Sequence, residues 1–378
     1  MNSSLELIDS ALHKSVKDRL ISSDLEVGAF LSGGIDSSLI VSVASNYVNK
    51  LKTFTVKFDG SYDESELAKL TAEKYSTDHT EISISMNLKD DVEKILCNYG
   101  EPFMDSSAIP SYYVSLEAKK HVSVVLNGDG ADELFGGYRR YVPIANNLIN
   151  YIKYFSKSVN VLPKPTNKVS NYNYFHRLLT LSRKTGLSFY NSATNDIFED
   201  VYKFNSTTTF KELEKFIFDI DNESISDLSK FLIYDFNLIL PNDLLKKMDI
   251  ATMANSLEGR SPFLSKYMLE LAPSLSDELK VKGLKTKVIL RELSKKYLIN
   301  KLINQPKRGF EVPLTRWVNG ELKENIIDSL LGNSYSSKFL KKDFIEKLID
   351  NKINASDEKR SKMLWTLYCL EVWRKNLK

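Results

Sequence analysis

The stretch that decides the fold is Val27–Leu39, VGAFLSGGIDSSL. It opens with a short apolar run, which predicts a buried strand, and this run gives way to Ser32-Gly33-Gly34. Apolar residues then recur at helical spacing from Leu39 to Ala44. We therefore predict a strand, a glycine turn and the N-terminus of a helix, an arrangement that points backbone N–H groups at an anionic ligand.

The glycine turn favours one kind of phosphate binding. Gly33 and Gly34 carry no Cβ, so the backbone can approach a phosphate closely. A Walker P-loop would need a lysine directly after its last glycine, and none follows here. Asp36 instead stands where a magnesium ion could bridge to phosphates. The pattern suits a loop that holds pyrophosphate as a leaving group, and the alternative is an ordinary turn after a strand.

The first 145 residues alternate strand-like and helix-like segments. The predicted strands are 27–31, 53–58, 79–84 and 122–126, and the predicted helices are 37–48, 64–75, 88–99 and 109–121. This alternation predicts an α/β fold in which helices flank a parallel sheet and ligands bind at the carboxyl ends of the strands.

The pattern of apolar residues changes after about Tyr141, where helical spacing becomes dominant. They are interrupted by an Asn-, Lys- and Pro-rich stretch, Leu162–Asn173, that is typical of a surface connection. We therefore expect a nucleotide-binding core over residues 1–145 and a mostly helical subdomain over residues 146–378 that completes the active site.

A second acidic, glycine-rich loop follows the fourth predicted strand, in Leu126–Tyr138, LNGDGADELFGGY. In a parallel sheet its strand end and that of Leu31 can open on the same crevice. Asp36 from one loop and Asp132 from the other would then share a Mg²⁺ ion, which commonly takes one or two protein carboxylates besides phosphate and water. The alternative is a structural turn with solvated acids.

A third motif is Leu244–Leu264, LLKKMDIATMANSLEGRSPFL. Its apolar stripe is typical of a core-facing helix. Glu258 and Arg260 stand two residues apart at the expected end of this helix. They would form either part of a polar, substrate-binding pocket wall or a plain structural salt bridge.

A fourth motif is Gln305–Phe310, QPKRGF. Lys307 and Arg308 lie between a proline and a glycine, so this segment could deliver a cation to the phosphate crevice, a charge that the glycine loop lacks. Without that context both would be surface charges.

Composition narrows the function classes. The formal charge of the 378 residues is only +3, which argues against a dedicated nucleic-acid binder. The chain has no apolar run long enough to span a membrane and no signal-peptide pattern, so we expect a cytoplasmic protein without a membrane partner. Cys97 and Cys369 are expected to be buried, reduced thiols, and the four histidines show no metal-ligand spacing.

Six blocks together resemble the asparagine synthetase family in its synthetase half. They are SGGIDSS, DESELA, EPFMDSSAIP, NGDGADELFGGY, MDIATMANSLEGRSPFL and PKRGF, in the family's order over nearly the whole chain. The resemblance implies a PP-loop (ATP pyrophosphatase) α/β domain, related to the adenine nucleotide α-hydrolases. It also implies that the β-carboxylate of aspartate attacks Mg-ATP to give β-aspartyl-AMP and pyrophosphate. Ammonia then displaces AMP, yielding asparagine.

The resemblance also implies roles for individual residues. Those that match the pyrophosphate loop are Ser32, Gly33, Gly34, Asp36 and Ser37, and those that match the adenosine site are Leu31, Val56, Asn127 and Gly128. Asp36 and Asp132 match the magnesium carboxylates, and Lys307 matches the lysine that neutralises the reacting phosphates. Asp129 falls where many relatives carry glutamate, so the acid is kept but is one methylene shorter, and a role with the incoming ammonia depends on its reach.

One departure concerns the nitrogen source. Full-length relatives begin with a glutaminase domain whose nucleophile is a cysteine after the initiator methionine, whereas residue 2 here is Asn2. We expect free ammonia or a separate glutaminase subunit to supply nitrogen, unless the chain is a fragment, and an oligomer is possible. The acceptor could instead be a peptide, a sugar acid or a β-lactam precursor. A non-catalytic nucleotide-binding scaffold and a PP-loop tRNA-modifying enzyme are further alternatives.

Overall fold

A computed structural model describes residues 1–57, 65–83, 87–163, 171–182, 197–198, 202, 211–305 and 312–377 of the protein. The chain forms two compact units, each assembled from three segments. Unit 1 comprises Met1–Ser85, Ser107–Asn146 and Ile225–Glu311, and unit 2 comprises Met86–Ser106, Asn147–Ser224 and Val312–Lys378.

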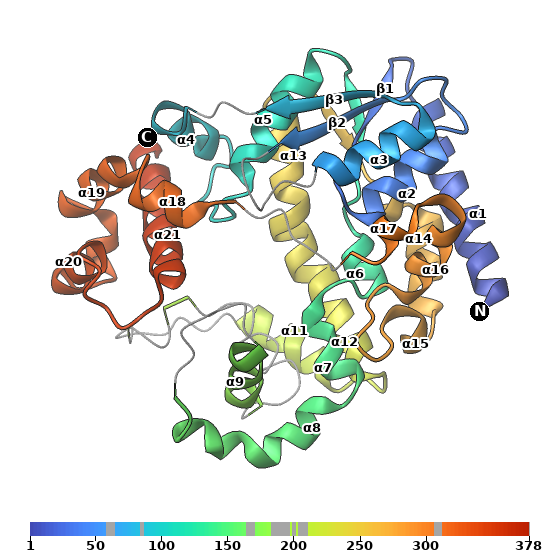
Figure 1. Ribbon diagram of the computed structural model, residues 1–378. Coiled ribbons are helices and arrows are strands. Elements are labelled where there is room, and N and C mark those ends of the chain that lie inside the picture. Colours follow the sequence, from blue (N-terminus) through green and yellow to red (C-terminus); the bar gives the residue numbers. More distant parts are fainter. Residues whose placement is uncertain are drawn as a thin grey trace. The chain divides into compact units, whose positions relative to one another are not determined.

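Unit 1 is built on a parallel sheet of five strands in the order β3-β2-β1-β4-β5 (Figure 1). The strands are β1 (Val27–Phe30), β2 (Lys52–Lys57), β3 (Asp78–Ser83), β4 (Val124–Leu126) and β5 (Glu258–Arg260). The helices between them are α2 (Ile35–Ala44), α3 (Ser65–Tyr75), α4 (Leu88–Cys97, in unit 2) and α5 (Ala108–Lys119). The predicted parallel sheet flanked by helices is therefore confirmed, with element ends shifted by a few residues.

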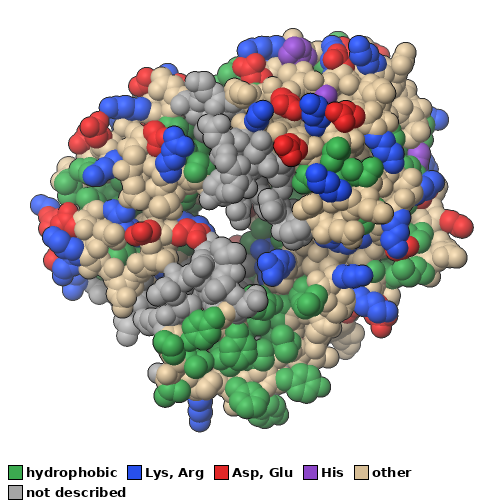
Figure 2. Space-filling view, in the orientation of Figure 1, with side chains coloured by type: hydrophobic (Ala, Val, Ile, Leu, Met, Phe, Trp, Pro, Cys, Tyr) green, Lys and Arg blue, Asp and Glu red, His purple; other side chains and the backbone are tan. Residues whose placement is uncertain are grey.

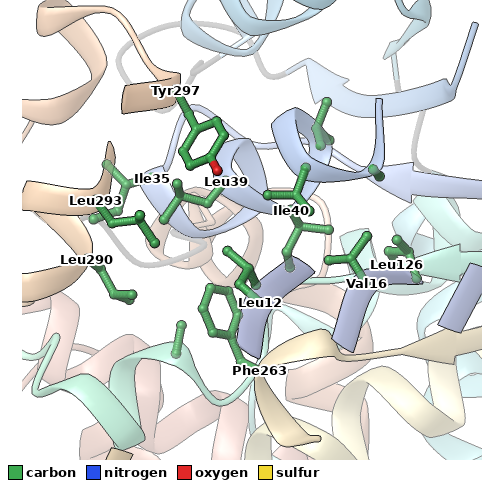
Figure 3. Close-up of a cluster of buried hydrophobic side chains, with 14 of the residues drawn as sticks. Leu12, Val16, Ile35, Leu39, Ile40, Leu126, Phe263, Leu290, Leu293 and Tyr297 are labelled. Carbon is green, nitrogen blue, oxygen red and sulfur yellow. The ribbon is translucent and has the colours of Figure 1, made fainter. Parts of the chain in front are cut away.

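One face of the sheet packs against helices from both ends of unit 1. Leu12 and Val16 of α1 (Asn2–Ile21) contact the same buried cluster as Leu39 of α2 (Figure 3). Leu290 and Leu293 of α16 (Val288–Tyr297) belong to the same cluster (Figure 3). Because α2 is buried nearly all round, it needs several packing partners, and α1 and α16 are two of them.

The opposite face of the sheet forms a smaller core around Phe54 and Val125. Val114 and Ala118 of α5 cover it. On β4, Val124 and Leu126 belong to the first core whereas Val125 belongs to this one, as expected for side chains that alternate across a strand.

A continuous helical segment runs before β5. It consists of α12 (Asp227–Tyr234), a wider π-helical part η3 (Asp235–Leu245) that contains Pro241, and α13 (Lys246–Met253). Proline cannot donate its backbone nitrogen to a helix, and widened turns accommodate that loss. The remaining elements of unit 1 are short: α6 (Ala131–Phe135), η1 (Arg139–Tyr141), α7 (Val142–Ala145), η4 (Pro262–Leu264), α14 (Lys266–Leu271), η5 (Ala272–Ser274), α15 (Asp277–Lys280) and α17 (Asn300–Ile303).

Unit 2 is helical in its described part, which agrees with the predicted helical character of the C-terminal region. Its long helix α21 (Asp357–Asn376) packs against α4, α18 (Leu314–Asn319) and α19 (Lys323–Leu331). The buried Trp365 of α21 donates its indole N–H to the carbonyl of Met104 at 2.8 Å. The other elements are α8 (Leu148–Ile152), η2 (Lys153–Asn160), α9 (Asn171–Leu181), α11 (Lys211–Asp221), η6 (Tyr335–Lys338) and α20 (Lys342–Ile349).

The structure bears on two expectations from composition, namely the burial of the cysteines and the lack of a membrane-spanning segment. Cys97 and Cys369 are both free thiols, but only Cys369 is buried; Cys97 is exposed near the end of α4, which corrects its predicted burial. Among the described residues, no helix combines the length and apolar character needed to cross a bilayer.

Candidate functional site

The order of the strands predicts a ligand-binding crevice at the ends of β1 and β4. The chain passes from β1 to β2 and β3 in one direction, whereas β4 and β5 pair on the other side of β1. At such a reversal the loops after the two central strands diverge, and ligands of open α/β sheets bind there. These loops are Leu31–Gly34 and Asn127–Gly130, the two that the sequence singled out.

The first loop is held in shape by its own serines. The Ser37 hydroxyl accepts the backbone N–H of Ser32 at 3.1 Å and lies 2.9 Å from the Ser32 hydroxyl. The Ser32 hydroxyl in turn accepts the N–H of Gly34, the N-cap residue of α2, at 3.2 Å. The loop therefore leads directly into the N-terminus of α2, whose partial positive charge favours an anion.

The second loop lies directly against the first. A Cβ built on Gly128 would stand 3.2 Å from the Cβ of Asp36 and 3.4 Å from the backbone nitrogen of Ser37. Gly130 has a φ of +86°, and a Cβ there would stand 2.3 Å from Leu264 Cδ2. A side chain at residue 128 would press on the first turn of α2, whereas one at residue 130 would meet Leu264 and an unfavourable φ, so both positions favour glycine.

The carboxylates of Asp36 and Asp132 converge on the ammonium group of Lys287. Lys287 Nζ lies 2.5 Å from Asp36 Oδ2 and 2.6 Å from Asp132 Oδ1. The Lys287 side chain is only 3% exposed. Since buried like charges repel strongly, the buried ammonium balances the charge of two acids from the first turns of α2 and α6, which follow the two loops.

Lys287 was not among the residues that the sequence singled out. This residue is the N-cap of α16 and has a φ of +52°, which is uncommon for a residue other than glycine. The positive end of a helix disfavours a lysine, so a lysine directly before the apolar pattern of α16 was the signal that could have found it.

Arg291, one turn further along α16, ties the Lys287 loop to a second segment. Its guanidinium donates to the carbonyls of Thr286 at 2.9 Å, Gln305 at 3.2 Å and Ile303. Burial lowers the pKa of Arg291, and the charges of Asp36 and Asp132 oppose this shift. Arg291 is thus a second cation in the electrostatic environment of the two carboxylates.

Glu133 adds a third acid beside this cluster. Burial, with a contribution from the charge of Asp132, raises the pKa of Glu133 to about 7. The hydroxyl of Tyr138 donates to Glu133 Oε1, and burial raises the pKa of that phenol as well. Glu133 therefore holds its proton over part of the neutral range, which limits the negative charge around Asp132.

The carboxylate pair suits a hard divalent cation. Asp36 Oδ1 is buried and has no hydrogen-bond partner among the residues that the structure describes. Mg²⁺ prefers oxygen ligands and needs only one or two carboxylates when phosphates and waters complete its coordination. The described ranges contain no cluster of three or more metal-ligating side chains, so substrate oxygens would have to supply the remaining ligands.

A pocket of about 540 Å³ opens beside the second loop in unit 1. Asn127 and Asp129 line it on the loop side, and the helical segment η3–α13 forms another wall. The hydroxyl of Ser261 donates to the carbonyl of Asp129 at 2.5 Å, which fixes the loop at this edge. The lining residues are Arg19, Asn127, Asp129, Pro241, Leu245, Lys246, Met248, Asp249, Gly259, Ser261 and Leu264.

Glu258 and Arg260 lie on β5 rather than at a helix end. They form a salt bridge at 2.7 Å, and Arg260 also donates to the carbonyl of Arg19 at 2.7 Å. Gly259 lines the pocket between them, whereas Glu258 and Arg260 do not. The structure shows the salt bridge between Glu258 and Arg260, and a role of the two residues in substrate binding stays a prediction.

The remaining predicted site residues are Leu31, Val56 and Lys307, of which the structure describes the first two. Leu31 is buried, and its carbonyl accepts the hydroxyl of Thr55 from β2. Val56 is partly buried at the rim of the smaller core. Lys307 lies outside the described residues, although Gln305, which Arg291 holds, is only two positions before it.

Comparison with known proteins places most of the chain in one protein family. The family model "Asparagine synthase" matches residues 7–375. The chain is 34% identical to "Asparagine synthetase [glutamine-hydrolyzing] 1" of Bacillus subtilis, over 97% of this chain and 58% of that protein. It is 30% identical to a "Putative asparagine synthetase [glutamine-hydrolyzing]" of Mycobacterium tuberculosis, over 97% of this chain and 57% of that protein.

The chain is also similar to a more distant protein that has a different name. "Amidase chyE" of Penicillium rubens is 25% identical over 83% of this chain and 53% of its own length. The chain thus spans somewhat over half the length of the curated relatives that it matches.

Proposed function

Because the chain belongs to the asparagine synthase family, we propose that it is an ATP-dependent amide-forming ligase that adenylates a carboxylate and transfers ammonia to it. The acceptor that we propose first is the β-carboxylate of aspartate, with asparagine, AMP and pyrophosphate as products. The observation that carries the proposal is the convergence of Asp36, Asp132 and Lys287 at the N-terminus of α2, beside a pocket.

ATP would bind across the crevice between β1 and β4. The turn Ser32–Gly34 and the first residues of α2, including Ser37, offer backbone N–H groups to the β- and γ-phosphates. Leu31 and Val56 would line the adenosine on one side, and Asn127 and Gly128 on the other. The close fit of Gly128 against Asp36 supports this arrangement, because it joins both loops into one surface.

Asp36 and Asp132 would hold Mg²⁺ when ATP binds. The ion would neutralise charge on the departing pyrophosphate. Lys287 supports this assignment because a buried cation already lies between the two carboxylates. With the divalent ion bound to the two carboxylates, the Lys287 ammonium would be free to pair with a phosphate oxygen.

The first chemical step joins two anions. A carboxylate oxygen of the acceptor attacks the α-phosphorus, the bond from that phosphorus to the bridging oxygen breaks, and pyrophosphate leaves with the electron pair. Like charges about 4 Å apart repel by roughly 4 kcal/mol at an effective dielectric constant near 20. Lys287 and, as we propose, Lys307 would offset this repulsion, so part of the chain beyond residue 145 completes the site.

The second step forms the amide. Ammonia attacks the acyl carbon of the adenylate, the acyl–oxygen bond breaks, and AMP leaves. Asp129 is the candidate base that takes the proton released by the attacking nitrogen, since it belongs to the second loop and lines the pocket. Either free ammonia or a separate glutaminase subunit would supply the nitrogen.

The pocket size favours a second candidate acceptor. A volume of about 540 Å³ lies within the range of pockets that hold ligands larger than a single amino acid. The charged lining, with Arg19, Lys246 and Asp249, suits an acceptor that carries both signs of charge. A larger carboxylate, such as a peptide or a sugar acid, would use the same adenylation steps.

The test is release of pyrophosphate and AMP from Mg-ATP in the presence of ammonium, screened across carboxylic acids with L-aspartate first. Ammonium is supplied directly, so the assay needs no glutaminase. We expect acceptor-dependent release that Asp132→Asn abolishes, whereas Asp343→Asn, an exposed position on α20, leaves it unchanged. Formation of ADP instead of AMP, or nucleotide binding without turnover for any acceptor, would contradict the proposal.

A further inference from the structure

An exposed aromatic ridge in unit 2 takes no part in the site described above. We define the ridge as Leu148, Tyr151, Tyr154, Phe155 and Val161, on α8, η2 and the residue that follows η2. All five side chains are exposed, Tyr154 by 86% and Phe155 by 67%. Figure 2 shows apolar side chains gathered where Figure 1 draws α8. Soluble proteins seldom leave so many neighbouring aromatic side chains in water without a partner for them.

The neighbouring helix extends this apolar surface. Tyr172 at the start of α9 donates its hydroxyl to the carbonyl of Pro163, just beyond η2, at 2.6 Å. Tyr174 and Phe175 on the same helix are also exposed. The hydrogen bond fixes α9 beside the ridge, so two elements present aromatic side chains in one region of unit 2.

In the sequence, the stretch that contains the ridge carries charges of a single sign. Residues 134–195 contain no Asp or Glu, although acidic residues make up 49 of the 378 in the chain. The same stretch carries nine basic residues: Arg139, Arg140, Lys153, Lys157, Lys164, Lys168, Arg177, Arg183 and Lys184. Lys153 and Lys157 alternate with the ridge residues, are exposed, and form no ion pair within the described ranges.

This combination matches the chemistry of an anionic bilayer surface. Tyrosine and phenylalanine rings insert at the level of lipid headgroups, and exposed lysines are attracted to negatively charged lipids. We propose that the aromatic ridge docks this protein on an anionic membrane surface. This proposal differs from the expectation of no membrane partner, because that expectation rested on the lack of a spanning segment and of a signal-peptide pattern, and docking on a surface needs neither.

Two other macromolecules fit the ridge less well. A nucleic acid would be bound chiefly through phosphate contacts to many basic side chains, yet apolar residues outnumber the lysines on the ridge. Leu148 and Val161 have no aromatic ring on which a base could stack. A second copy of the chain would place Lys153 and Lys157 opposite like charges across a two-fold interface, which disfavours self-association.

The experiment is sedimentation of the full chain with vesicles, one set of phosphatidylcholine alone and one with about a third phosphatidylglycerol. We expect binding to the anionic vesicles that weakens with added salt. Lys153→Gln and Lys157→Gln should each lower the partition coefficient roughly fivefold. The triple variant Tyr151→Ser, Tyr154→Ser, Phe155→Ser should lower it by at least about tenfold.

The chain offers a matched control for the aromatic residues. Phe218 on α11 is 67% exposed, as Phe155 is, but it lies on a helix rich in acids. Phe155→Ser should weaken vesicle binding, and Phe218→Ser should leave it unchanged. Circular dichroism of each variant checks that it is folded.

The proposal would be overturned by a lack of binding to either vesicle or by an equal loss of binding in both phenylalanine variants. Light scattering that shows the ridge mutations dissociating a dimer of the chain would also overturn it. Preferential binding of the ridge to a single-stranded oligonucleotide over anionic vesicles would overturn it as well. Pyrophosphate release is measured separately, so its loss or retention does not bear on this result.

Discussion

Gly137 lies so close to Asp132 that a Cβ on Gly137 would stand 1.7 Å from Asp132 Oδ1. The same Cβ would stand 2.3 Å from the Cε of Lys287. The backbone N–H of Gly137 also donates to the carbonyl of Asp132 at 2.8 Å. The carboxylate–ammonium pair therefore rests against bare backbone, and the absence of a side chain at residue 137 is a condition for it to form.

Gly137→Ala is expected to displace the Asp132 carboxylate and the Lys287 side chain together. A clash in a packed region costs about 1–3 kcal/mol of stability. Because a displacement of about 1 Å in a positioned group can lower a rate by about 10², pyrophosphate release should fall by at least this factor. Urea denaturation and the pyrophosphate assay measure the two effects.

Gly332→Ala is the control for that change, since the nearest atom to a Cβ there is 3.6 Å away. It should alter stability by less than about 0.5 kcal/mol. If both alanine variants behaved alike, close packing around Asp132 would not be what requires Gly137.

Lys287→Met removes the buried ammonium and leaves Asp36 and Asp132 without it. Breaking a buried ion pair costs about 3–5 kcal/mol, so the variant should unfold at a lower temperature than the original protein. Added Mg²⁺ should recover more stability in Lys287→Met than in the original protein, since the ion no longer competes with an ammonium group. Calorimetry with and without MgCl₂ measures this difference.

Lys266→Met is the matched control, because Lys266 pairs with Glu270 at 3.7 Å on an exposed surface. It should change neither the stability nor the response to Mg²⁺. An equal Mg²⁺ response in all three proteins would mean that Lys287 does not share a site with the ion.

Lys307→Ala tests the role that the sequence suggested for QPKRGF. If Lys307 neutralises the reacting phosphates, its loss should slow formation of the adenylate by about 10²–10³, the scale of losing one preorganised charge-stabilising group. Positional isotope exchange in ATP reports this step separately from amide formation. An unchanged exchange rate would remove Lys307 from the mechanism.

Arg291→Lys tests whether the Lys287 loop and the segment around Gln305 are held together. Lysine cannot reach the carbonyls of Thr286, Ile303 and Gln305 at once, so most of this network is lost. We expect a loss of about 2–4 kcal/mol in stability and a lower kcat for pyrophosphate release. Arg316→Lys, on an exposed side chain, should affect neither, and similar losses in both variants would argue against a specific role for Arg291.

His79 should make stability depend on pH. Burial lowers the pKa of His79 below its ordinary value of 6.5, and Nδ1 lies 2.9 Å from the hydroxyl of Thr53. The unfolded chain therefore takes up this proton first, so the stabilisation is complete above about pH 6.5 and is lost as the pH falls below that value. The stability of His79→Gln should fall less between pH 7.5 and 5.5.

Urea denaturation at each pH measures the free energy of unfolding of both proteins. His121→Gln serves as the control because that side chain is exposed. Parallel pH profiles for the original protein and His79→Gln would show that His79 contributes nothing to the pH dependence.

Much of the sheet could be predicted because its signals are local. The apolar run before Ser32 and the alternation of short strands with helical patterns each depend on a few neighbouring residues, and the strands appear within two residues of the predicted bounds. β5 was missed because its three residues, Glu258–Arg260, include no β-branched or aromatic side chain. Pairing with β4, and not intrinsic preference, makes this segment a strand.

The candidate site could be predicted only where a loop has a recognisable local sequence pattern. Glycines and acids after a strand marked Asp36 and Asp132, whereas Lys287 is one of 52 basic residues and has several lysines nearby. Its importance depends on tertiary structure, since α16 must pack on α2 before the ammonium can reach either loop.

The pairing of Asp36 with Lys287 spans 251 positions of the chain. At about 5–20 residues per second, a ribosome needs roughly 13–50 s to proceed from the first partner to the second. During this interval the nascent polypeptide already contains its glycine turn but lacks the counter-charge for it. A nascent chain that has not yet reached Lys287 would therefore hold Asp36 and Asp132 side by side without the cation that balances them.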